Sequence, residues 1–192
     1  MVNRIIKEIK VALDNECYIV ALMGALTLPD ICGKNAYPEL KNVGERYKQW
    51  CDTFVYPQTQ HANEDDKTLD CGITYLSGEI IYSLRCYMLH QGSADIEGKK
   101  CNVEDFELII QPKNDFDIYI DNFGAIWSNG DFEQRERHMR LHIRNICRDL
   151  CNAAELYYQN HTDEFGFIKY KIAQINPDAK HPWEYSKNVF GE

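Results

Sequence analysis

The sequence predicts a mainly α protein, a helical bundle with a β-hairpin inserted before its last long helix. Two observations predict this class. Apolar residues recur every three or four positions over most of the chain, which is the period of an amphipathic helix. Between residues 101 and 127 the pattern changes to short apolar runs separated by turn residues, which is typical of paired strands. The length of 192 residues fits one helical domain over 1–192, with the hairpin at 101–127 and an irregular C-terminal segment at 162–192.

Two helices are expected at the start of the chain. The apolar face of the first consists of Ile5, Ile6, Ile9 and Leu13. The second, 16–28, is apolar nearly all round, so we expect it at the centre of the core. Breaks in the chain are then expected at Pro29, Gly33 and Pro38.

Two further helices are expected on either side of a polar loop at 57–70. One spans 42–55, and its apolar stripe is Val43, Tyr47, Trp50 and Phe54. The other begins after Ser77, which can act as the N-cap, and ends before Gly92, where a C-terminal glycine is favoured. Its apolar stripe is Ile80, Ile81, Leu84 and Met88.

The inserted hairpin is expected to pair the strands 106–110 and 116–120, with a third strand around 125–127. A long helix should follow from Asp131, with Gln134 in the capping-box position. Its buried stripe is Met139, Ile143, Ile146, Leu150 and Tyr157.

The charge limits the partners that the chain can bind through its overall field. It has 21 Lys+Arg against 30 Asp+Glu, a net charge of −9. A protein this acidic is not expected to coat DNA or an anionic membrane, so nucleic-acid binding would need a local basic patch. The N-terminus lacks the apolar region of a signal peptide, and the longest apolar run, 17–28, is too short to span a bilayer. We therefore expect a soluble, cytoplasmic protein without membrane contact.

The cysteines and histidines give no pattern of a metal site. The eight cysteines are spread along the chain without a C-x-x-C pair. We expect reduced, mostly buried thiols, with a disulfide scaffold as the less favoured alternative. His138 and His142 are four residues apart, but no Glu or Asp completes an H-E-x-x-H pattern. We expect no metal and no cofactor.

The stretch 82–92, Tyr-Ser-Leu-Arg-Cys-Tyr-Met-Leu-His-Gln-Gly, contains the residues best suited to chemistry. Arg85 is a permanent cation whose planar fork matches phosphate oxygens. His90, five residues later, belongs to the side-chain type best placed to move protons near neutral pH. The negative end of the helix dipole favours its protonated form. The pair is a reasonable set for phosphate-ester chemistry.

The spacing Arg-x4-His on a helix, followed by glycine, resembles the signature of the HEPN superfamily. This superfamily includes metal-independent ribonucleases of toxin–antitoxin, phage-defence and type VI CRISPR systems. The resemblance implies a helical homodimer in which two motifs face one another and RNA is cut by attack of a 2′-hydroxyl on the neighbouring phosphate. Arg85 would hold the phosphate and His90 would act as general base or acid. Cys86 stands where many members have Asn, Asp or His.

Two alternatives to this site are open in the sequence. The pair Arg137 and His142 has the same spacing, but the first pair is preferred because it ends a helix at a glycine. Arg85 could also be a surface residue paired with an acid such as Glu79, with His90 as a capping residue.

A second basic feature is a ridge on the expected long helix. It consists of Arg137, Arg140, Arg144 and Arg148. A ridge of this kind could follow the phosphates of RNA. A solvated face paired with neighbouring acids is an equally good interpretation.

The leading hypothesis is therefore an RNA-cleaving or RNA-binding homodimer, a toxin or phage-defence effector that an antitoxin or another protein could bind. Dimerisation has a chemical reason, because one Arg85/His90 pair has one titrating group and cleavage needs both a base and an acid. The alternative, suggested by Cys86 and the acidic charge, is a non-catalytic helical module that binds a nucleotide or a protein. A third is a scaffold whose hairpin pairs with a partner strand.

Overall fold

The computed structural model describes residues 1–57, 77–91, 105–110, 124–128, 135–162 and 165. The protein is mainly helical, as predicted. The helices are α1 (Val2–Asp14), α2 (Tyr18–Ala25), α3 (Leu28–Ala36), α4 (Val43–Phe54), α6 (Gly78–Cys86) and α7 (Ile143–Asn160). A π-turn, η1 (Tyr87–Gln91), continues α6, and the strands are β1 (Asp105–Ile109), β2 (Gly124–Ser128) and β3 (Arg135–His142). The segments 58–76 and 166–192, which contain most of the expected loop and C-terminal segment, lie outside the described residues.

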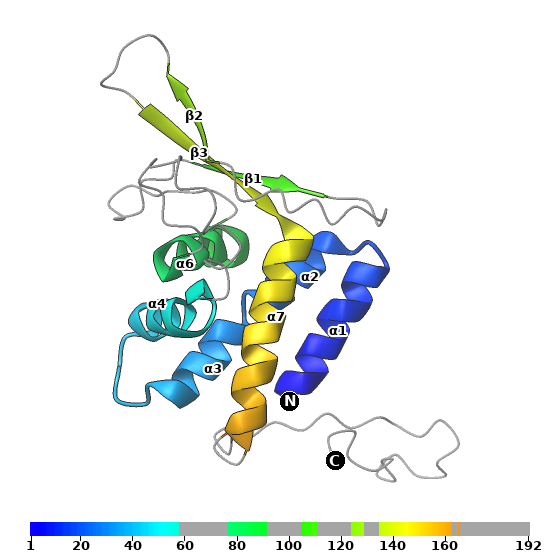
Figure 1. The fold of residues 1–192 in the computed structure, drawn as a ribbon, viewed down its shortest axis with the longest axis vertical. Coiled ribbons are helices and arrows are strands. Elements are labelled where there is room, and N and C mark those ends of the chain that lie inside the picture. The colour runs from blue at the N-terminus through cyan, green and yellow to red at the C-terminus, as the bar shows by residue number, and fades with distance from the viewer. Residues whose placement is uncertain (58–76, 92–104, 111–123, 129–134, 163–164, 166–192) are drawn as a thin grey trace.

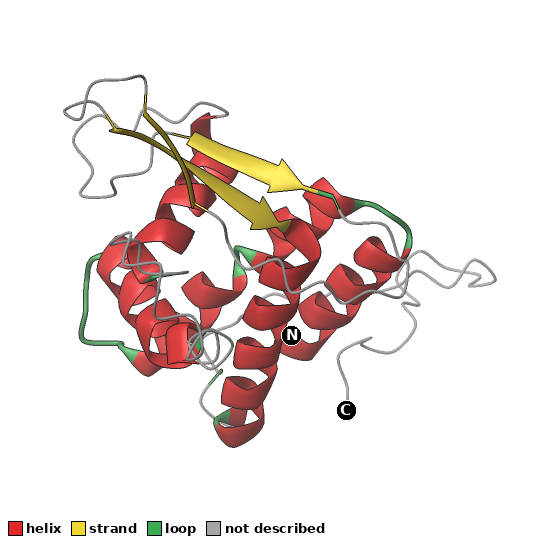
Figure 2. Ribbon diagram, turned by 45° about the horizontal axis from the view of Figure 1, so that its top comes forward, coloured by secondary structure: helices red, strands yellow, loops and turns green. Residues whose placement is uncertain are grey.

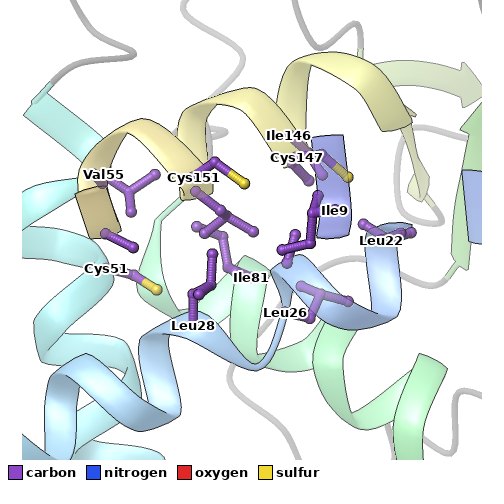
Figure 3. Packing of buried hydrophobic residues seen from close by; sticks show 14 of the residues in the cluster. Ile9, Leu22, Leu26, Leu28, Cys51, Val55, Ile81, Ile146, Cys147 and Cys151 are labelled. Carbon is purple, nitrogen blue, oxygen red and sulfur yellow. The ribbon is translucent and has the colours of Figure 1, made fainter. Parts of the chain in front are cut away.

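Helix α7 forms the centre of the helical part, with α1 and α2 on one side and α3 and α4 on the other (Figure 1). Four residues of its predicted stripe, namely Ile143, Ile146, Leu150 and Tyr157, are buried as expected. Figure 3 shows side chains from α1, α2, α3, α4 and α6 meeting beneath α7. The buried cluster explains why the apolar stripes of these helices are spaced as they are.

Helix α1 has the predicted apolar face, with Ile6 and Ile9 buried. The expectation that the next helix is central was wrong. Ala21, Leu22 and Ala25 of α2 are buried, but Val20 is 66% exposed and Ile19 47%. An apolar sequence did not determine burial here, because α7 occupies the centre of the bundle and α2 covers one side of it.

The expected break after α2 is instead the start of helix α3. Pro29 occupies its first turn, where a missing N–H costs no hydrogen bond. Gly33 lies inside α3, and a Cβ at this position would stand 3.0 Å from the Arg46 carbonyl oxygen of α4. This glycine therefore allows α3 and α4 to approach closely, and it does not end the helix.

The strands form a three-stranded sheet in the order β1-β3-β2, which lies across one end of the helices (Figure 2). Strand β1 pairs with β3 in parallel, Ile109 opposite His142, and β2 pairs with β3 antiparallel, Gly124 opposite Met139. Strands were correctly predicted at β1 and β2. Strand β1 pairs with β3, which the sequence did not suggest; the strand expected at 116–120 as its hairpin partner lies outside the described residues.

The prediction that one helix runs from Asp131 was also wrong. Residues 135–142 form the middle strand of the sheet, and α7 begins only at Ile143 with His142 as its N-cap. The backbone of the middle strand is hydrogen-bonded to neighbours on both sides, and this pairing overrides a local helical pattern. The expected cap, Asp131 with Gln134, lies outside the described residues.

None of the helices in the described part of the chain is long and apolar enough to cross a membrane.

Candidate functional site

Helix α6 places Arg85 on the side of the bundle that faces α3 and α4. The helix begins as predicted, since the Ser77 hydroxyl accepts a hydrogen bond from the Ile80 amide at 3.4 Å. A second cap comes from α4, where the Asp52 carboxylate accepts from the Gly78 amide at 2.6 Å. Ile81 and Leu84 are fully buried and anchor the helix to the core. The position of Arg85 in space is thus set by two caps and an apolar face.

The Arg85 guanidinium is held by a carboxylate and two aromatic rings. Its Nε donates to Asp30 Oδ2 at 2.8 Å, and the two side chains are 14% and 24% exposed. The guanidinium carbon lies 5.8 Å from the ring centroid of Tyr47 and 5.8 Å from that of Tyr82. These distances are those of cation–π contacts. The guanidinium of Arg85 is therefore held in one orientation before any ligand binds.

The carboxylate also offsets the effect of burial on Arg85. Burial by itself lowers the pKa of Arg85, but the hydrogen bond and the negative charge of Asp30 outweigh this effect and raise it. Arg85 remains a cation at every pH of interest. The acid named from the sequence, Glu79, is not its partner, because Glu79 pairs with Lys48 at 2.7 Å.

His90 lies in η1, directly after the α-helical part of α6. In a regular α-helix two residues five positions apart lie on different faces. A π-turn is wound more loosely, with i→i+5 bonds, so each residue turns the chain through a smaller angle. The change of winding brings the backbone position of His90 nearer to the face that carries Arg85. The imidazole ring and Gly92 lie outside what the structure describes.

The second Arg-x4-His pair does not form a comparable arrangement. Arg137 belongs to β3, and His142 ends that strand. His142 is only 6% exposed, and burial lowers its pKa. A buried, neutral imidazole at a strand–helix junction is poorly placed to exchange protons with a substrate. Arg137 and His142 therefore do not share a helix, as the motif would require.

The basic ridge is not a single helical face. Arg137 and Arg140 lie on β3 at positions of opposite sheet faces, whereas Arg144 and Arg148 lie on α7. Arg144 Nη2 donates to the Leu13 carbonyl at 3.0 Å and to the Tyr18 hydroxyl at 3.3 Å. Arg144 therefore joins α7 to the C-terminal end of α1, and the four arginines do not lie along one helix.

Arg144 and Arg148 are therefore expected to contribute differently to the stability of the protein. Arg144→Ala is expected to lower the free energy of unfolding by roughly 1.5–3 kcal/mol, because charged hydrogen bonds at a helix end are lost. Arg148 is 40% exposed and 3.5 Å from the adjacent Asp149, so Arg148→Ala should cost below about 0.5 kcal/mol. Urea unfolding of the two variants measures the difference. Equal losses would contradict the assignment of Arg144 to the packing of α1 on α7.

The histidines and cysteines in the described part of the chain are not grouped as metal ligands. In a strand, residues four apart are about 13 Å apart, so the backbone positions of His138 and His142 in β3 are not adjacent as they would be on a helix. Among the described residues, no group of three or more His, Cys, Asp or Glu side chains could hold one. Burial raises the pKa of Cys32 to about 12 and that of Cys151 to about 11, so these thiols are protonated and unreactive at neutral pH.

The sequence pattern indicated Arg85 and His90 as candidates, but it did not indicate the residues that hold the arginine. Asp30 is 55 positions away from Arg85 in the chain, and Tyr47 lies on a third element. Tyr47 was assigned to a core stripe, which is correct, since it is fully buried and its hydroxyl donates to the Leu26 carbonyl at 3.1 Å. No spacing rule links these positions, so only the packing of α3, α4 and α6 could show the cluster.

Comparison with known proteins gives no relative for this chain: no family model, no curated protein and no solved structure matches it.

Proposed function

We propose that the protein is a metal-independent endoribonuclease whose site is formed by Arg85 and His90. One observation carries this proposal: a cation held by Asp30, Tyr47 and Tyr82 lies in the last turn of α6, and His90 follows in the adjoining π-turn. A fixed guanidinium stabilises the charge that develops on a phosphate during cleavage. An imidazole supplies the proton transfer that the reaction needs.

The reaction also explains why two copies of the chain would act together. Attack by a 2′-hydroxyl requires one group to remove its proton and another to protonate the leaving 5′-oxygen. One chain offers a single histidine at this site, whereas a two-fold symmetric homodimer offers two histidines and two arginines around one phosphate. The products are a 2′,3′-cyclic phosphate and a free 5′-hydroxyl. A cellular role as a toxin or phage-defence effector, bound by an antitoxin or another protein, would be consistent with this activity.

A second candidate is a non-catalytic module that binds a nucleotide or a protein. The low exposure of Arg85, 14%, favours a non-catalytic protein, because an arginine that is paired and largely covered can serve the fold alone. One experimental result distinguishes the two candidate functions. Saturable binding of nucleotide without any cleavage of RNA supports the module and contradicts the nuclease.

The experiment is an assay of the purified protein with labelled RNA of mixed sequence in the presence of EDTA. We expect fragments that carry 2′,3′-cyclic phosphate ends, identified by their mobility before and after acid treatment. The matched substrate has the same sequence with 2′-deoxyribose throughout, and it should remain intact because the attacking hydroxyl is missing. Cleavage of the deoxy substrate, or a need for added metal ions, would contradict the mechanism.

A further inference from the structure

We propose that Asp30 is a positioning residue that sets the orientation of the Arg85 guanidinium for the scissile phosphate. This inference rests on the proposed ribonuclease function, and it adds a residue from a different helix to the site. Asp30 would not touch the substrate. It would act through its contact with Arg85 Nε, which measures 2.8 Å.

The position of Asp30 suits a permanent negative charge. It lies in the first turn of α3, directly after Pro29. The positive end of the helix dipole favours an ionised carboxylate there, and the proline ring restricts the backbone that carries it. The carboxylate is 24% exposed, so water screens it only in part. Asp30 is therefore a rigid, charged acceptor at a defined point beside α6.

The contact restrains the direction of the whole guanidinium fork. A guanidinium has five N–H groups in one plane, so a bond to Nε together with rings of Tyr47 and Tyr82 beside the plane leaves little rotational freedom. The two rings are themselves packed together, with centroids 5.4 Å apart. An unrestrained arginine would lose its rotamer freedom when it binds the phosphate. With Asp30 in place, the rotamers of Arg85 are already restricted in the folded protein. The loss of side-chain entropy therefore occurs during folding and not when the substrate binds.

The test is a double-mutant cycle on RNA cleavage with Asp30→Asn and Arg85→Ala. The amide keeps the size of the side chain but loses its charge. We expect Asp30→Asn to lower kcat by roughly 10- to 100-fold with little change in KM, which is the effect of a misplaced group in the transition state. In the Arg85→Ala background, the same substitution should cause no further loss. The matched control is Glu79→Gln. Glu79 also pairs with a cation, Lys48, which lies 5.4 Å from the Tyr82 ring centroid. The kcat of this variant should stay at the wild-type value.

A spectroscopic readout separates this inference from the proposed function. Hydrogen exchange at Arg85 Nε, followed by ¹⁵N NMR, should be slow in the wild type and in Glu79→Gln but faster in Asp30→Asn. Unchanged exchange, or losses of kcat that multiply in the double variant, would overturn the positioning role. Wild-type protein that cuts no RNA would refute the ribonuclease function and with it a role in cleavage. The Nε signal would then report a purely structural pair.

Discussion

Replacing His90 with alanine is expected to lower the rate of RNA cleavage by about 10² to 10⁴-fold, the usual contribution of a general acid or base. The loss should appear in kcat measured in EDTA, because proton transfer occurs only in the transition state. His90 lies in the π-turn that follows α6, at the end of the helix. Far-UV circular dichroism and the urea midpoint should therefore remain close to wild type.

The control for this prediction is His161→Ala, a second histidine at a helix end. His161 is the C-cap of α7; its ring stacks on Tyr157 at 4.3 Å, and its Nδ1 is 2.8 Å from the Tyr157 carbonyl. This end of α7 points away from α6 (Figure 1). His161→Ala should keep full cleavage activity. If His90→Ala cuts RNA as fast as the wild type, the site assignment is wrong even where the protein proves to be a ribonuclease.

The largest effect on stability is expected from Gly78→Ala. Gly78 is the first residue of α6. A Cβ at this position would overlap the carbonyl oxygen of Lys48 in α4 and would lie 2.6 Å from the Lys48 Cα. The obstacle is backbone, so no side-chain rotation can remove it. We expect a loss of about 3 kcal/mol or more in the free energy of unfolding, equivalent to a fall in Tm of roughly 6–12 °C for a chain of this size. The backbone displacement that relieves this overlap would also disturb the hydrogen bond from the Gly78 amide to Asp52.

Gly24→Ala provides the comparison, because it adds the same methyl group inside α2. The nearest atom to that methyl is Ile9 Cγ1 at 3.1 Å, which belongs to a side chain and can move. The gain in helix propensity from glycine to alanine, about 0.5–1 kcal/mol, also works in its favour. Thermal unfolding should place this variant within about 1 kcal/mol of the wild type. A Gly78→Ala variant as stable as Gly24→Ala would contradict the close approach of α4 and α6.

The helices with strong local signals could be predicted from the sequence. Ser77 is the N-cap of α6, as predicted. Helix α4 begins beside the expected start at residue 42, where the Asn42 side chain accepts from the Gly44 amide at 2.9 Å. The stripe of α7 from Ile143 onward was read correctly for the same reason, since a period of 3.6 residues identifies the face that a helix buries. Such signals are local, and they hold whichever way the elements pack.

Strand β3 could not be predicted in the same way. Residues 135–142 include only two apolar residues, Met139 and Leu141, and Met139 falls in phase with the helical stripe that follows. The segment is a strand because β1 and β2 pair with it on both sides. That pairing depends on residues far away in the chain, so the basic ridge drawn on a single helix was divided between a strand and a helix.

The sequence by itself determined the helical class, the caps and stripes of the helices, and the candidate pair Arg85 and His90, because each of these depends on residues within a few positions of one another. Only the tertiary structure decided that Asp30 and Tyr47 hold Arg85, that Arg144 joins α7 to α1, and that one side of α2 is exposed. Contacts of this kind join residues tens of positions apart, and their free energy arises only when the helices pack.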